Sequence, residues 1–197
     1  AIPWDHTTPI KAASDGYYHH DIKPGDVVCW PTNLGWMMGP WLIFASLINR
    51  ATIALYEGVP TERGFCEFVQ DAHVTMLGLV PGIVKGWRAS NCAADLDWSH
   101  VRTFSSSGEA SDPNDYRWLM TLNQPPGIIK PVIEYCGGTE VGGSYIGNNL
   151  VTPQNPGAFN GKIIGNDFTV IDETGKPCQP GEIGEVFLIP PSIGLSI

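Results

Sequence analysis

Apolar and β-branched residues occur in short runs that alternate with longer amphipathic segments through the first two-thirds of the chain. The apolar runs predict strands over residues 27–30, 51–56, 74–80, 101–105 and 131–135. The segments between them predict helices over residues 36–49, 61–72, 81–90 and 112–122. Strands separated by helices of about ten residues or more are joined by β–α–β crossovers, so we expect a largely parallel sheet with flanking helices.

The pattern changes after residue 150. Short strands then alternate with turns, over residues 162–164, 168–172 and 185–189, and predict an antiparallel β-meander packed on the first region. The expected fold class is therefore α/β, with an α/β part over residues 1–150 and a β-rich continuation of the same domain over residues 151–197. An abrupt start and an apolar end are atypical of natural termini, so we expect the domain to be incomplete and a C-terminal domain to be absent.

The composition is that of an ordinary globular protein, with 43% hydrophobic and 16% charged residues. The formal net charge is −9, and 11 Lys and Arg residues form no basic stripe, which argues against a nucleic-acid partner. No apolar run reaches the ~18 residues of a membrane helix, because Gly39 and Pro40 interrupt the longest one. The first residues lack the basic and apolar regions of a signal peptide.

The cysteines and histidines argue against a metal site. The five cysteines are scattered and none has C-x-x-C spacing, which indicates reduced thiols in a cytosolic-type compartment rather than zinc ligands. His6, His19 and His20 offer another metal-binding set. Adjacent histidines on a helix point in different directions, however, and we expect these side chains at the surface.

Three loops rich in small residues follow predicted parallel strands, over residues 31–36, 105–111 and 135–143. The carboxyl ends of parallel strands are where open α/β sheets bind their ligands. Glycine and serine also allow a planar ring or a phosphate to approach the backbone closely. The sequence therefore predicts a binding cleft at this edge of the sheet.

The third loop contains Thr139, a hydroxyl donor, beside Glu140, a hard carboxylate suited to magnesium bound to phosphate. The glycines around them allow backbone N–H groups to turn toward an anion. By pattern alone a structural turn remains the alternative. A nucleophile elbow at Ser106 is excluded because Phe104 stands where that motif requires glycine.

Other side chains near these loops have two interpretations. An aromatic and methionine cluster fills either a core or a ligand cavity, and the core is favoured; its members are Trp36, Met37, Met38 and Trp41. Cys136 reads as a small buried residue, because no basic neighbour would activate its thiol.

Five segments, read in order, resemble the adenylate-forming superfamily of acyl-CoA synthetases, luciferases and adenylation domains. They are residues 25–40 (GDVVCWPTNLGWMMGP), 51–60 (ATIALYEGVP), 107–110 (SGEA), 135–140 (YCGGTE) and 181–185 (GEIGE). The resemblance covers essentially the whole chain and favours acetyl-CoA synthetase-like, plant-type acyl-activating enzymes and their bacterial relatives. Two departures are Arg50, where relatives often have glycine, and one extra residue before Thr139.

The resemblance implies part of an AMP-binding domain with a role for each matching residue. The residues implied against adenine are Gly108, Glu109 and Ala110. Those implied to border adenine and the α-phosphate are Glu134, Tyr135, Cys136 and Gly138. Thr139 would bind the phosphate, and Glu140 would hold Mg²⁺. Those implied around the acyl group are Trp36, Met37, Ser107 and Gly137.

The implied activity is that of an ATP-dependent carboxylic acid–CoA ligase, with ATP, Mg²⁺, coenzyme A and an acid as its ligands. The acid is adenylated with release of pyrophosphate, and the thiol of CoA then displaces AMP. Acetate-specific relatives close the acyl pocket with a tryptophan where this chain has Gly137, so an acid larger than acetate is expected. A Gly137→Trp change is expected to favour the shortest acids.

The family's phosphate loop, its ribose-binding aspartate and its catalytic lysine are expected outside this sequence, so the 197 residues alone should have negligible turnover. Two alternatives stay open. One is an adenylating enzyme with another acceptor, such as a carrier-protein thiol, and the other is a non-catalytic nucleotide-binding or scaffold protein. The expected location is cytoplasmic, or peroxisomal if the protein comes from a plant.

Overall fold

The computed structural model describes residues 2–194, and the last three residues of the apolar end lie outside this part. The described helices are α1 Thr7–Tyr18, α2 Met38–Ile48, α3 Arg63–Asp71, α4 Pro81–Ser90 and α5 Pro113–Thr121. The strands are β1 Val27–Cys29, β2 Thr52–Ala54, β3 Met76–Leu79, β4 Thr103–Ser106, β5 Val132–Gly138, β6 Gly143–Gly147, β7 Gly161–Lys162, β8 Asp167–Ile171 and β9 Glu185–Ile189.

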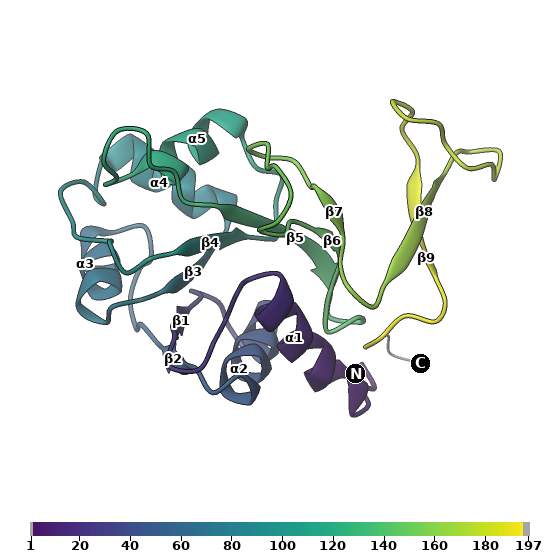
Figure 1. The fold of residues 1–197 in the computed structure, drawn as a ribbon, viewed down its shortest axis with the longest axis horizontal. Coiled ribbons are helices and arrows are strands. Elements are labelled where there is room, and N and C mark those ends of the chain that lie inside the picture. The colour runs from purple at the N-terminus through teal and green to yellow at the C-terminus, as the bar shows by residue number, and fades with distance from the viewer. Residues whose placement is uncertain (1, 195–197) are drawn as a thin grey trace.

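Seven strands form the main sheet in the order β2-β1-β3-β4-β5-β6-β7. All pairs from β2 to β5 are parallel, whereas β6 and β7 add antiparallel strands at the edge. Helices cover both faces, with α1 and α2 on one side and α3, α4 and α5 on the other (Figure 1). This arrangement confirms the predicted α/β class with a mainly parallel sheet.

Each face of the sheet has its own core. Phe65, Trp87 and Leu119 pack from α3, α4 and α5 against one face, whereas Trp41 and Ala45 of α2 belong to the core on the other. Every residue of β3 and β4 is buried, because helices cover the strands on both sides. This explains why those strands read as continuous apolar or small residues rather than as an alternating pattern.

Local sequence signals set several helix ends. The carboxylate of Asp112 accepts hydrogen bonds from the N–H groups of Asn114 and Asp115, and Pro113 occupies the first turn of α5. Pro81 plays the same part in α4, which ends at Asn91 in the left-handed conformation. Among residues 2–194, no helix combines the length and the hydropathy of a membrane span.

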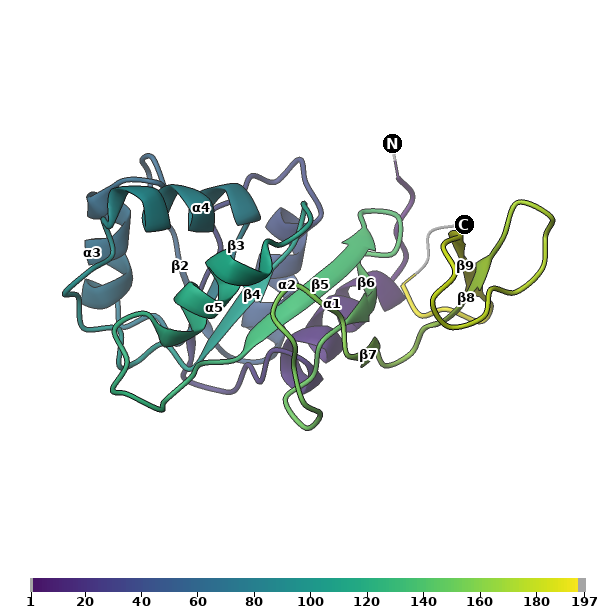
Figure 2. The same ribbon diagram turned by 90° about the horizontal axis from the view of Figure 1, so that it is seen from above.

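The C-terminal strands are antiparallel as predicted, but they do not form one meander. β7 pairs with β6 in the main sheet, and β8 and β9 form a separate two-stranded sheet. That hairpin stands away from the main sheet in both views (Figures 1 and 2). Val186 and Phe187 are exposed on it. The ring of Phe168 contacts Tyr145 of β6 with centroids 6.2 Å apart, so only part of its apolar surface packs on the first region.

The sequence pattern also missed α1 and β6. The buried residues of α1 include Lys11, Asp15 and Gly16, which interrupt the apolar periodicity by which an amphipathic helix is recognised. β6 begins at Gly143, the last residue of the third predicted loop, and is short with a glycine at each end, so its sequence reads as part of the loop.

Candidate functional site

The three predicted loops meet at one end of the sheet and line a cleft of about 1230 Å³. All of the predicted site residues line it, namely Trp36, Met37, Ser107, Gly108, Glu109, Ala110, Glu134, Tyr135, Cys136, Gly137, Gly138, Thr139 and Glu140. They come together because β1, β4 and β5 run parallel and end at the same edge. The predicted cleft is confirmed.

Several cleft residues were not predicted. Tyr56, Gly58 and Pro60 follow β2, and Val80 follows β3, so the rule used for the other loops would have found them. Phe159 comes from the irregular segment between β6 and β7, and no signal in its local sequence pointed to the cleft.

The aromatic and methionine cluster divides between cleft and core. Trp36 is 69% exposed and lines the cleft with Met37, whereas Trp41 is 1% exposed. Trp30 reaches the cleft beside β3, where a Cβ built on Gly78 would lie 2.6 Å from Cγ of the Trp30 indole. Glycine at position 78 is therefore required for the indole to lie across this strand.

The turn that carries Thr139 and Glu140 is closed by its own backbone. The N–H groups of Val141 and Gly142 both donate to the Gly138 carbonyl, at 3.0 and 3.1 Å. Glu140 is exposed at the cleft, and within residues 2–194 neither its carboxylate nor the Thr139 hydroxyl has a hydrogen-bond partner. Both groups are therefore free to bind a ligand.

Glu134 is the buried carboxyl of the cleft, at 6% exposure. Its Oε2 accepts a hydrogen bond from the Ser111 hydroxyl at 2.9 Å, while Oε1 has no partner within the described residues. Burial raises the pKa of Glu134 to about 7. An unpartnered oxygen in a buried site is an acceptor suited to an N–H donor of a ligand.

Gly137 lines the cleft, but the space beside it differs from the expectation. A Cβ built at this position would lie 2.5 Å from Cα of Ser144 and closer still to the Gly143 carbonyl. The glycine is needed because β6 passes so close at the bulge between Cys136 and Gly137. A tryptophan here would push β6 away rather than simply fill an acyl pocket.

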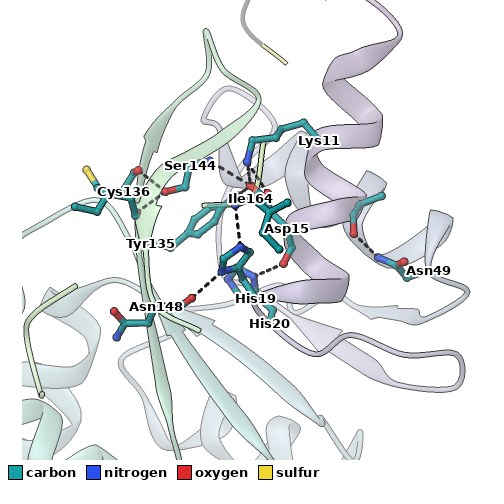
Figure 3. A network of polar contacts seen from close by, with 12 residues as sticks. Lys11, Asp15, His19, His20, Asn49, Tyr135, Cys136, Ser144, Asn148 and Ile164 are labelled. Carbon is teal, nitrogen blue, oxygen red and sulfur yellow. Dashed lines mark hydrogen bonds and ion pairs between the residues drawn. The ribbon is translucent and has the colours of Figure 1, made fainter. Parts of the chain in front are cut away.

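His19 and His20 are buried, at 3% and 1% exposure, so the prediction that they lie at the surface is wrong. Nδ1 of His19 lies 2.9 Å from the Asn148 carbonyl, and its Nε2 accepts from the Ile164 N–H. Burial lowers the pKa of His20 to about 3. The nitrogens of His20 lie 3.1 Å from the Asp15 carbonyl and 2.9 Å from the Ser105 hydroxyl, so both rings have partners inside the protein (Figure 3), which their polarity alone did not indicate.

A buried polar network lies between α1 and the β5–β6 strands (Figure 3). Lys11 pairs with Asp15 at 2.5 Å, and both side chains have 0% exposure. Asp15 Oδ2 also accepts hydrogen bonds from the Tyr135 hydroxyl and from the Ser144 N–H. The network fixes one wall of the cleft, because Tyr135 belongs to that wall.

The charged side chains that line the described cleft are all acidic. Among the described residues that line it, Glu109, Glu134 and Glu140 are acidic and none is Lys or Arg. No three His, Cys, Asp or Glu side chains gather as a metal cage within residues 2–194. Magnesium held mainly by phosphate oxygens and water needs only one or two protein carboxylates, and Glu140 fits that requirement.

Comparisons with known proteins agree with this geometry. A family model described as AMP-binding enzyme matches residues 3–195. Hexanoyl-CoA synthase of Cannabis sativa is 52% identical over 100% of this chain, and probable acyl-activating enzyme 17, peroxisomal, of Arabidopsis thaliana is 49% identical over 100%. The chain spans 27% of the length of each of these curated relatives.

The solved structures agree as well. Acetoacetyl-CoA synthetase from Streptomyces lividans superimposes with a TM-score of 0.90 at 26% sequence identity. The match covers 100% of this chain and 31% of that one.

Proposed function

The chain belongs to the AMP-binding enzyme family, and from that premise we propose that it is the adenylate-binding part of an ATP-dependent carboxylic acid–CoA ligase. An oxygen of the acid attacks the α-phosphorus of ATP, and the bond to pyrophosphate breaks as the new P–O bond forms. The thiol of CoA then loses its proton and attacks the acyl carbonyl, and AMP leaves. The observation that carries the proposal is the convergence of all the predicted site residues on one cleft.

The described residues supply binding and orientation. Gly108, with φ of +100°, turns the loop so that its backbone faces a flat ring. Glu134 Oε1, which has no partner within the described residues, accepts a hydrogen bond from the amino group of the base. The Thr139 hydroxyl donates to the α-phosphate, and Glu140 would hold a Mg²⁺ ion bound to the phosphates. Bound Mg²⁺ would neutralise charge that develops on the phosphate oxygens.

The acidic lining of the cleft means that the positive charge needed to bind a triphosphate must come from other segments. A triphosphate needs several positive charges, and the described cleft residues include none from Lys or Arg. We propose that cationic side chains from other segments complete the site and are needed for both adenylation and thioester formation. The 27% share of the relatives' length is consistent with such segments.

We propose an acid larger than acetate as the substrate. The cleft of about 1230 Å³ leaves room beyond a nucleotide, with Trp30 and Met37 as apolar walls. A relative at 52% identity is named for hexanoyl-CoA, which is consistent with a medium-length chain. Reduced cysteines and a relative named as peroxisomal support the cytosol or the peroxisome as its location, which a fluorescent fusion would distinguish.

The test is carboxylate-dependent ATP–pyrophosphate exchange by the protein expressed from its uninterrupted reading frame. Acids from acetate to long-chain and aryl acids are compared, and exchange is expected to peak beyond acetate. Thr139→Val and Glu140→Gln should reduce exchange at least tenfold, as expected when groups that bind reacting phosphates are lost. Glu67→Gln, which removes only a surface pair with Arg63, is the control.

A folded protein that shows no exchange with any acid would refute the proposal. That result would favour a non-catalytic nucleotide-binding protein. Exchange without CoA thioester formation would instead indicate an adenylating enzyme with a different acceptor.

A further inference from the structure

The segment from Trp4 through α1 follows the two strands that flank the Thr139 turn. At one end, the indole Nε1–H of Trp4 donates to the Thr139 carbonyl at 2.7 Å. Thr8 then lies against Gly142, because a Cβ on that glycine would collide with the Thr8 methyl group. Farther along the helix, Asp15 accepts hydrogen bonds from Tyr135 and Ser144 on β5 and β6 (Figure 3).

Trp4 connects this turn to a second element. Its ring lies edge-on to Phe44 of α2, with ring centroids 6.4 Å apart. The other hydrogen bond to the Thr139 carbonyl comes from Gly142, at 3.2 Å, within the same turn. The indole N–H is therefore the group that ties this peptide to the rest of the described structure.

We infer that Trp4 is a positioning residue for the phosphate-binding turn. By holding the Thr139 carbonyl, the indole fixes the peptide plane between Thr139 and Glu140, and with it the direction of the two free side chains. Preorganised donors and ligands act on a phosphate without the cost of ordering them at each turnover. The identity of the ligand, a phosphate, rests on the proposed function, whereas the hydrogen bond from Trp4 to the turn does not depend on it.

The substitution Trp4→Phe isolates the hydrogen bond, because phenylalanine retains an aromatic ring against Phe44. The loss of one hydrogen bond corresponds to roughly a 2- to 12-fold effect. We expect kcat/KM for ATP in the exchange assay to fall by that factor. The KM for ATP should rise while the KM for the acid at saturating ATP stays unchanged, whereas a general loss of folded protein would lower the apparent kcat and leave both KM values unchanged.

Trp98→Phe is the matched control. Trp98 donates its indole N–H to the Cys66 carbonyl at 3.1 Å, and it packs in the core formed with α3 and α4 without lining the cleft itself. This variant removes the same chemical group from a buried carbonyl. It should lower the unfolding temperature while leaving the KM for ATP unchanged.

Hydrogen–deuterium exchange without substrates tests the contact independently of catalysis. Amides of residues 139–142 should exchange roughly 2- to 12-fold faster in Trp4→Phe, and no faster in Trp98→Phe. Faster exchange there together with a selective rise in the KM for ATP supports the inference. Unchanged amide exchange, or a KM for ATP equal to that of the wild type, overturns it. A wild-type protein without pyrophosphate exchange refutes the proposed function instead, and the amide exchange still decides the role of Trp4.

Discussion

Replacing Asp15 by asparagine is expected to destabilise α1 strongly. The side chains of Lys11 and Asp15 have 0% exposure, so the substitution leaves a buried ammonium group without its counter-charge. Removing one partner of a buried ion pair costs about 3 to 5 kcal/mol. The amide NH₂ group would also face donors, namely the Tyr135 hydroxyl and the Ser144 N–H if it replaces Oδ2, or the Lys11 ammonium group if it replaces Oδ1.

The pH dependence of this effect follows from the lysine. Burial already lowers the pKa of Lys11, and the negative charge of Asp15 opposes that shift. Without Asp15 the folded-state pKa of Lys11 falls further below its ordinary value of 10.5. The cost of burying the lysine is greatest at low pH, where the lysine of the unfolded chain is protonated. This cost shrinks as the pH rises toward the ordinary lysine pKa, so the loss of stability should be larger at pH 6 than at pH 10.

Hydrogen–deuterium exchange of the peptide that covers α1 measures this free energy locally in the full-length protein. Protection should fall by roughly a hundredfold or more in Asp15→Asn. The double variant Lys11→Met with Asp15→Asn removes the stranded ammonium group and should recover much of the loss. If the effects of Lys11→Met and Asp15→Asn on the free energy of opening α1 are instead additive within about 0.5 kcal/mol, no stranded charge exists and the reasoning is refuted.

Three further predictions concern the cleft itself. Gly78→Ala should force the Trp30 indole toward the cleft, lower stability by about 1 to 3 kcal/mol, and shift pyrophosphate exchange toward shorter acids; an unchanged acid profile would contradict the role of Trp30 as a wall of the acyl pocket. Glu134, with a pKa of about 7 against an ordinary 4.5, stabilises the fold below pH 4.5, and this contribution is lost as pH rises through 7. Thermal unfolding of Glu134→Gln should therefore depend less on pH between 4.5 and 8, and an equal dependence would exclude the raised pKa. Gly137→Ala should already loosen the β5–β6 pairing, visible as faster amide exchange of residues 143–147, because its Cβ meets the β6 backbone; wild-type exchange there would show that the strands tolerate a side chain.

Much of the parallel sheet was predictable because covered strands and crossover helices leave strong local signals. Phe65 and Val69 mark α3 by their spacing, and Pro81 and Asp112 mark the starts of helices. α1 was missed because its stability depends on tertiary contacts. Its buried charges are satisfied by β5 and β6, which sequence periodicity cannot show.

The cleft was predictable to the extent that its residues follow parallel strands. The loops at Trp36, Ser107 and Thr139 were located by that rule, and Tyr56 would have been located by the same rule. The partners Ser111 and Glu134, the buried state of His19, and the approach of β6 to Gly137 depend on how distant segments meet. No local pattern encodes these contacts.

Photolabelling with 2-azido-ATP, followed by peptide mapping, tests most directly whether the cleft binds the adenine of a nucleotide. We expect a saturable label, displaced by ATP, in peptides that contain residues 106–110 and 134–140. A saturable, ATP-displaceable label confined to other segments would contradict it.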